Sequence, residues 1–411
     1  MAKVRPFRAV RPTPELADKV AALPYDVMSS AEARQMAAGN PYSFLHVDKA
    51  EIDLPEDTDI YAPEVYQKAK ELLWGMVEDG NFVQDSAPCY YLYELTMNGR
   101  SQTGIVACAS IDDYRNGVIK KHENTRREKE EDRVRHVDTC DAQTGPIFLA
   151  YRNQENLKKL VAEVKEEQAL FDFTSEDEIR HRGWKIADAA KISAIYEAFH
   201  QMDALYIADG HHRAASAVRV GVKRREEHPG YTGEEEFNYF LSVIFPDDEL
   251  MIMDYNRVVR DLNGLTAEGF QGEIKKVFDV EPLDKAEHPK RKGQVTLFLA
   301  DQWYLLTLKP EYANSDPVEG LDVSVLQKQI LEPVLGIRDP KTDKRIDFVG
   351  GIRGLSELER RVHTDMKAAF AMYPTSIGEL FAVADAGLLM PPKSTWFEPK
   401  LRSGLFIHAL R

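Results

Sequence analysis

Features that often identify a protein class are rare or missing in this chain. Its 411 residues include only three cysteines, Cys89, Cys108 and Cys140, without a C-x-x-C pair or a metal-type spacing. So few cysteines argue against a disulfide framework and are typical of a reducing compartment. No apolar run is long enough to span a bilayer, and residues 1–7 show no apolar signal-peptide core. We therefore predict a cytoplasmic protein with no membrane partner.

The common fingerprints of nucleotide and metal sites are missing as well. The chain contains neither the G-x-x-x-x-G-K-[ST] loop nor the G-x-G-x-x-G turn, so the P-loop and Rossmann classes are not indicated. No H-x-x-x-H pair lies on an expected helix, which disfavours a zincin.

Basic residues are fewer than acidic ones, at 53 Lys and Arg against 68 Asp and Glu, so the formal net charge is −15. An acidic surface repels a phosphate backbone, so we expect no nucleic-acid partner, although a local basic pocket can bind one nucleotide. A chain of this length can form two domains. We predict an N-terminal region at 1–246 and a C-terminal α+β domain at 247–411, because the strand expected at 240–245 completes an α/β unit.

Hydrophobic patterning predicts a mixed α/β protein. Two apolar segments, 90–96 and 103–109, flank Asn98 and Gly99, which is a strong hairpin signal. Gly221 is expected to end the helix that begins near residue 211. The other predicted elements are a helix from Ser29 or Ser30 to Ala38, helices at 63–79, 128–140, 154–168, 191–201, 321–335, 355–365 and 376–387, strands at 118–123, 146–151 and 405–408, and a second hairpin at 295–308.

The densest group of reactive side chains lies in residues 204–217, which read as an apolar strand, a tight turn and a helix. The N-terminus of a helix presents free N–H groups and a positive dipole end, which suit a phosphate. Asp209 would orient a substrate hydroxyl or bind magnesium. The simpler alternative makes Asp209 a helix cap with histidines beside it, but a cap does not require two histidines and an arginine. The predicted phosphate-binding residues are Gly210, His211, His212 and Arg213.

A second candidate segment follows the strand expected near residue 119. Glu123 lies among basic residues, whose charge would hold the pKa of its carboxyl low, as suits a base or a magnesium partner. The alternative is an exposed charged loop. The neighbouring candidates are His122 as a catalytic residue and Thr125 and Arg126 as phosphate or nucleotide ligands. We expect Asp132 and Arg133, on the next helix, to form an ordinary ion pair or cap.

A third segment, residues 390–404, combines cations and hydroxyls. These could bind a substrate or another anion, whereas the prolines and aromatics of the segment favour a packed loop. The candidate ligands are Lys393, Ser394, Thr395 and Lys400.

Together these segments resemble the prokaryotic domain of unknown function 1015 family over nearly the whole chain. The resemblance rests on residues 23–27, 40–44, 121–125, 145–148, 207–213 and 392–395. The middle section is also similar to the ParB/sulfiredoxin superfamily in its order of elements, and to the free-serine kinase branch at both candidate segments. This resemblance implies a ParB/sulfiredoxin-like mixed core at about 110–246 with added N- and C-terminal α+β regions.

The resemblance also implies an activity. Glu123 would match the catalytic carboxylate of the kinases, Asp209 the acid near the substrate hydroxyl, and residues 210–213 the phosphate cradle. The implied reaction transfers a phosphoryl group from ATP or ADP, with magnesium, to a small hydroxylated metabolite, with free L-serine as the best guess. The stretch between Ile147 and Asp209 is longer than in the compact kinases, and this leaves the substrate open.

Other functions remain alternatives at this point. A nucleotide-binding regulatory module of the ParB-like type would bind nucleotide without turnover, and a metal-dependent hydrolase would need bound zinc or manganese. Sulfiredoxin-like chemistry is disfavoured, because it needs a cysteine at the turn. The sequence leaves the oligomeric state open, including a homo-oligomer.

Overall fold

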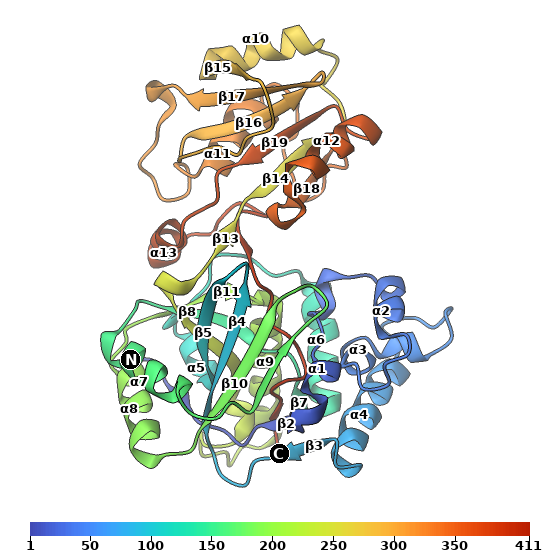
Figure 1. Ribbon diagram of the computed structural model, residues 1–411, viewed down its shortest axis with the longest axis vertical. Coiled ribbons are helices and arrows are strands. Elements are labelled where there is room, and N and C mark those ends of the chain that lie inside the picture. Colours follow the sequence, from blue (N-terminus) through green and yellow to red (C-terminus); the bar gives the residue numbers. More distant parts are fainter. The chain divides into compact units, whose positions relative to one another are not determined.

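The computed structural model describes residues 1–411, which form two compact units. Unit 1 comprises Met1–Leu250 together with Pro399–Arg411, and unit 2 comprises Met251–Glu398 (Figure 1). The first division lies close to the boundary expected after Pro246, but the end of the chain returns to unit 1. It does so because strand β21 (His408–Ala409) pairs with β7 (Ala142–Gln143) and Ile407 bridges to Val10. Only this short strand forms where one at 405–408 was expected.

Unit 1 is built on a nine-stranded mixed sheet with the order β6-β11-β8-β12-β5-β4-β10-β9, and β1 pairs with β5. Strand β11 runs parallel to β6, and β12 runs parallel to β8, while the other pairs are antiparallel. The predicted mixed α/β class is therefore confirmed. The strands are β1 (Val4–Arg5), β4 (Tyr90–Met97), β5 (Arg100–Ser110), β6 (Ile119–Lys120), β8 (Ile147–Tyr151), β9 (Phe171–Thr174), β10 (Arg180–Ile186), β11 (Leu205–Asp209) and β12 (Tyr239–Pro246).

The predicted hairpin is strands β4 and β5. Asn98 and Gly99 have φ values of 51° and 77°, as the two central residues of a type I′ turn require. The neighbouring strands β9 and β10 were not predicted from the sequence. They extend this hairpin to the edge of the sheet.

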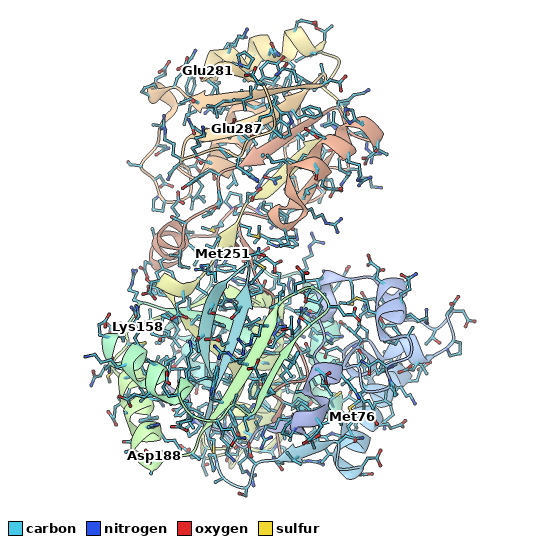
Figure 2. All side chains as sticks on the ribbon, viewed as in Figure 1. Met76, Lys158, Asp188, Met251, Glu281 and Glu287 are labelled. Atoms are coloured by element: carbon cyan, nitrogen blue, oxygen red, sulfur yellow. The ribbon has the colours of Figure 1, made fainter.

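Helices cover the sheet and add a second core. Ser29 and Glu32 form a capping box at the start of α2. Asp188, which is labelled in Figure 2, caps α8 by accepting a hydrogen bond from the Lys191 N–H. Apolar side chains of α7, α8 and α9 pack with the sheet, while α2, α3 and α4 share a core with β2 (Val10–Pro12) and β3 (Phe82–Gln84). The helices are α1 (Ala17–Val20), α2 (Ser30–Ala37), α3 (Leu45–Asp48), α4 (Pro63–Glu78), α5 (Ile111–Arg115), α6 (Arg127–Cys140), α7 (Glu155–Lys165), α8 (Ala189–His200) and α9 (His211–Glu227).

The prediction that Gly221 ends its helix is wrong, because α9 continues to Glu227. Gly221 is buried inside the helix, where a Cβ atom would lie 2.4 Å from the Phe237 carbonyl oxygen and 2.7 Å from Cδ1 of Ile111. The glycine therefore serves close packing rather than helix termination.

Unit 2 has its own six-stranded sheet, with the order β15-β17-β16-β19-β14-β18. The predicted hairpin is strands β16 and β17, joined at Ala300 and Asp301, which both have positive φ. A π-helical segment, Gln327–Leu331, continues α11. The elements are β13 (Ile252–Met253), β14 (Tyr255–Val259), β15 (Phe278–Leu283), β16 (Gln294–Leu299), β17 (Gln302–Leu308), β18 (Ile346–Gly350), β19 (Ala368–Met372), β20 (Trp396–Phe397), α10 (Ala267–Val277), α11 (Asp322–Leu326), α12 (Gly354–Thr364) and α13 (Ile377–Asp385).

No helix in residues 1–411 combines the length and the apolar character needed to cross a membrane.

Candidate active site

Sheet topology brings the first two candidate segments to one edge of unit 1. Strands β6 and β11 are parallel neighbours, so the segments that follow them leave the sheet at the same edge. Strand β8 is antiparallel to β11 and begins there, with Phe148 opposite Asp209. The loop after β6, the turn after β11 and the start of β8 therefore adjoin one another.

The turn after β11 depends on a glycine for two reasons. Gly210 has φ of 90°, a conformation that residues with a side chain rarely adopt. A Cβ atom at this position would also lie 3.0 Å from Nε of Arg213. Gly210 occupies the cap position of α9, and no side chain caps this helix. The alternative in which Asp209 caps α9 is thus wrong, and the first N–H groups of the helix are left for another partner.

Two cations hold the carboxylate of Asp209. Nη2 of Arg213 lies 3.1 Å from Oδ2, and Nζ of Lys400 lies 3.8 Å from Oδ1. Burial alone would raise the pKa of Asp209, but the charges of Lys400 and Arg213 bring it below its usual value. Arg213 also donates to the carbonyl oxygen of Pro146, which ties the turn to the start of β8. Asp209 is therefore an anion at neutral pH.

Two histidines connect the turn to the loop that carries Glu123. The rings of His122 and His211 meet edge to face with their centroids 4.5 Å apart, and Nδ1 of His211 lies 4.0 Å from Oε2 of Glu123. Burial lowers the pKa of His122 to about 4, and burial together with His122 lowers that of His211 well below its ordinary value. Both rings are therefore neutral at pH 7. The Glu123 side chain is 41% exposed and remains accessible.

Thr125 and Arg126, which follow Glu123 in the loop, form hydrogen bonds to the neighbouring helices. The hydroxyl of Thr125 donates to Glu130 on α6, and the Arg126 N–H donates to Nε2 of His212 at 2.9 Å. Arg126 is the cap residue of α6. In this structure Thr125 and His212 thus join the loop to helices α6 and α9.

The third candidate segment is divided between the two units. Lys400 belongs to unit 1 and reaches Asp209, whereas residues 393–395 belong to unit 2. There the Ser394 hydroxyl donates to the Pro391 carbonyl oxygen at 2.7 Å, and Nζ of Lys393 lies 5.5 Å from the centre of the Tyr255 ring.

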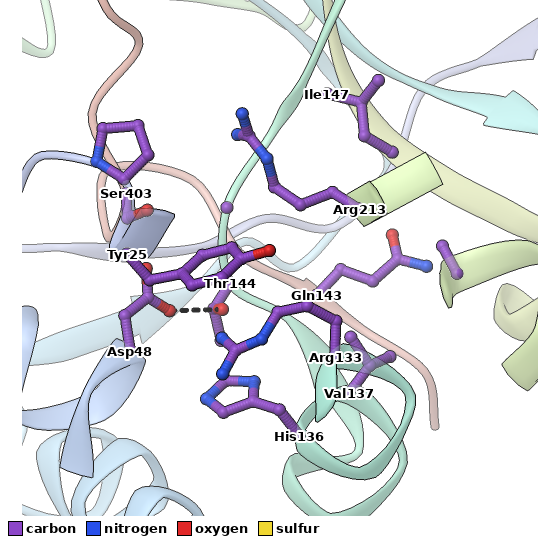
Figure 3. Close-up of a pocket in the computed structure, with 13 residues that line it drawn as sticks. Tyr25, Asp48, Arg133, His136, Val137, Gln143, Thr144, Ile147, Arg213 and Ser403 are labelled. Carbon is purple, nitrogen blue, oxygen red and sulfur yellow. Dashed lines mark hydrogen bonds between the residues drawn. The ribbon is translucent and has the colours of Figure 1, made fainter. Parts of the chain in front are cut away.

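A small pocket, partly open to solvent, lies beside the turn. It shares Arg213 with the turn (Figure 3). The only local signal for it was the polar spacing of Arg133 and His136, three residues apart and therefore on one face of α6. The expected ion pair of Asp132 with Arg133 is present, with Nε 2.9 Å from Oδ2. The lining residues with polar side chains are Tyr25, Asp48, Arg133, His136, Gln143, Thr144, Arg213 and Ser403.

In residues 1–411, no group of three or more His, Cys, Asp or Glu side chains is arranged to hold a metal ion. Asp209 is a single carboxylate, and it fits a magnesium ion that takes its other ligands from phosphate oxygens and water.

The chain matches the family model described as "Protein of unknown function (DUF1015)" over residues 4–324. No curated protein matches it. Among solved structures, a mutant of free serine kinase in complex with AMP is similar over 72% of this chain and 92% of its own, with 14% identity and a TM-score of 0.36. C-terminally truncated SbnI from Staphylococcus aureus covers 72% and 85%, with 11% identity and a TM-score of 0.38. A conserved hypothetical protein from Pyrococcus furiosus covers 73% and 94%, with 16% identity and a TM-score of 0.35. At this distance these similarities assign no activity.

Proposed function

Because the chain belongs to the DUF1015 family of proteins of unknown function, we propose its activity from the arrangement of its own residues. It acts as a nucleotide-dependent phosphotransferase on a small hydroxylated metabolite, with free L-serine as the first candidate. The observation that carries this proposal is the approach of the Glu123 carboxylate to His211, in the first turn of α9, whose N-terminus is uncapped and follows Asp209. Nδ1 of His211 lies 4.0 Å from Oε2 of Glu123, and His211 follows Asp209 by two residues.

Unsatisfied donors support phosphate binding at the turn. Nε of Arg213 is buried and has no hydrogen-bond partner in the structure, and the same is true of Nε2 of His211. A buried polar group without a partner costs about 1–3 kcal/mol, so such groups in a native structure call for an explanation. Phosphate oxygens would accept from Arg213 and from the free N–H groups of α9, which supply positive potential where phosphate charge lies.

The carboxylates of Glu123 and Asp209 have different roles in the proposed reaction. As the acceptor oxygen forms its bond to phosphorus, the bond from phosphorus to the leaving nucleotide breaks, and the acceptor proton passes to Glu123. Asp209 stays ionised beside Lys400 and Arg213, so it accepts a hydrogen bond from the acceptor hydroxyl or holds magnesium. When bound, magnesium would neutralise part of the phosphate charge. His122 is a positioning residue, because it is 2% exposed and packs on His211.

The choice of L-serine and of ATP or ADP comes from the resemblance of residues 121–125 and 207–213 to the free-serine kinases. Whether ATP or ADP donates the phosphoryl group is therefore to be determined by assay.

A direct assay combines the purified full chain with ATP or ADP, magnesium and L-serine, and follows phosphoserine by mass spectrometry. We expect product, and we expect Glu123→Gln to lower kcat by at least about 100-fold, because it removes the base without changing the shape of the side chain. Glu128→Gln, in the first turn of α6, is the matched control. The proposal fails if neither L-serine nor any other alcohol tested gives a product that depends on Glu123. Tight nucleotide binding without product would instead favour the regulatory module.

A further inference from the structure

The pocket beside the turn contains donors that no protein group satisfies. The Arg133 side chain is about nine-tenths buried, and its guanidinium carbon lies 4.0 Å from the centre of the Tyr25 ring. Its only hydrogen bond in the structure runs from Nε to Asp132, so its two terminal nitrogens donate to nothing. A guanidinium presents these N–H groups as a planar fork, and a carboxylate is the small group that matches the fork.

The same pocket contains one acceptor without a donor and one buried carboxylate. Nε2 of His136 lies 3.1 Å from the carbonyl oxygen of Val47, and because a carbonyl only accepts, Nε2 carries the proton. Burial, reinforced by Arg133, lowers the pKa of His136, so the ring is neutral and Nδ1 carries a lone pair. That Nδ1 atom is buried and unpartnered. Asp48, 3% exposed, adds a carboxylate that accepts one hydrogen bond from Thr144 at 2.7 Å.

This set of groups discriminates between ligand classes. A simple anion would satisfy Arg133 but would leave Nδ1 of His136 without a donor and would bring a second negative charge beside Asp48. A simple amine would satisfy those acceptors but would leave Arg133 unpaired. A ligand with a carboxylate and an ammonium group on one carbon atom satisfies both sides, and the pocket is partly open to solvent, so such a ligand can enter it.

We propose that this pocket binds a free α-amino acid, with its carboxylate on Arg133 and its ammonium group between Asp48 and His136. The amino acid is the phosphoryl acceptor, and this part of the inference rests on the proposed function. Arg213 connects the two halves of the site, since it lines the pocket and holds Asp209. Tyr25 and Asp48 come from the N-terminal region, which thereby contributes to the site from outside the predicted core at 110–246.

The test begins with the full chain in the absence of nucleotide. A thermal-shift screen of the twenty L-amino acids identifies the one that raises Tm most. Calorimetric titration then compares this amino acid with its decarboxylated amine and with its 2-hydroxy acid counterpart. We expect each counterpart to bind at least about tenfold more weakly, because each leaves a buried charged group without its partner. The proposal is overturned if no amino acid raises Tm, or if both counterparts bind as well as the amino acid.

Two variants locate the binding site. Asp48→Asn should weaken binding of the amino acid but not of the hydroxy acid, and Arg133→Lys should weaken both. Arg225→Lys is the matched control, because Arg225 is a similarly buried arginine that pairs with Asp112 away from the pocket. Unchanged affinities in both variants would overturn the proposal. If a variant does not fold, as judged by circular dichroism, the comparison of the three ligands on the wild-type chain still tests the proposal.

Phosphotransfer assays separate this inference from the proposed function. Binding of an amino acid without phosphorylated product would defeat the proposed function and leave the pocket assignment standing. Product formation with an unchanged acceptor KM in Asp48→Asn and Arg133→Lys would defeat the pocket assignment and leave the phosphotransferase standing.

Discussion

Two segments that the sequence predicts as possible anion sites differ in whether their buried polar groups have hydrogen-bond partners. In the turn at residues 209–213, Nε of Arg213 and Nε2 of His211 are buried without partners. The third segment, residues 390–404, differs between its two parts: in residues 390–396, no buried polar side-chain atom lacks a partner, and the Ser394 hydroxyl and carbonyl are both bonded within unit 2, whereas Nε of Arg402, in unit 1, is buried without a partner. Both segments contain cations and residues with positive φ, Gly210 in one and Lys393 in the other.

The difference shows how a binding site and a packed loop of similar composition can be told apart. The polar groups of a packed loop already have partners within the protein, so a ligand adds no hydrogen bond that they lack. Buried donors without partners cost free energy in the unliganded protein, and a ligand that supplies acceptors removes this cost. The turn therefore has the character of a site, and the 390–396 segment that of a structural loop.

The largest expected effect is on the pH dependence of stability. Burial keeps His122 neutral in the folded state down to about pH 4, while the unfolded chain takes up that proton near pH 6.5. As the pH falls between these values, only the unfolded state gains the proton, so the free energy of unfolding should fall by about 3 kcal/mol from this residue. Urea unfolding at pH 7 and pH 4 should show a smaller loss in His122→Gln, whereas the exposed His363→Gln should match the wild type. Equal losses in all three chains would contradict this prediction.

Arg213→Lys should weaken nucleotide binding about 30-fold. Lysine keeps the charge but cannot contact Asp209, the Pro146 carbonyl and a phosphate at the same time, as the guanidinium can. The loss corresponds to about 2 kcal/mol, the size of a hydrogen bond to a charged group. Calorimetric titration with ADP measures it, with Arg219→Lys on the same helix as the control, since that side chain is 42% exposed. Similar affinities for the two variants would remove Arg213 from the phosphate site.

Gly210→Ala tests whether the turn needs its glycine for more than backbone conformation. Gly99 has a similar positive φ of 77° but no neighbour within 4 Å of a Cβ atom, whereas a Cβ atom on Gly210 would meet Arg213. Gly99→Ala should therefore cost about 1 kcal/mol of backbone strain, and Gly210→Ala somewhat more, together with a fall in nucleotide affinity. Thermal unfolding and titration of both variants measure the two effects. Unchanged nucleotide affinity in Gly210→Ala would mean that the position of the Arg213 guanidinium does not matter.

Local signals predicted much of the fold and the position of the turn. Asn98 and Gly99 specify their hairpin through backbone conformation alone, and the pattern of residues 204–217 predicts a strand, a turn and a helix that the structure contains. The misreading of Gly221 has a different origin, because the contact that demands a glycine there comes from Phe237, outside the helix.

The pocket could not be predicted in this way. Asp48 and Thr144 meet by a hydrogen bond across 96 positions of the chain, and the partners of Arg213 include Pro146, 67 positions away. Spacing within one element cannot reveal such contacts, since they depend on how the N-terminal region and residues 399–411 pack in unit 1.

The smallest effects should come from the two lysines that the sequence placed in one anion-binding segment. Lys400 is 3.8 Å from Asp209 and is partly responsible for keeping it ionised, so Lys400→Ala should lower kcat about three- to tenfold. Lys393 packs on Tyr255 in unit 2, and Lys393→Ala should change kcat and the nucleotide Kd by less than about twofold. Steady-state kinetics of the two variants at pH 7 measures the contrast. If Lys393→Ala lost as much activity as Lys400→Ala, the 390–396 segment would have to be counted as part of the active site, and satisfied polar groups would no longer distinguish a packed loop from a binding site.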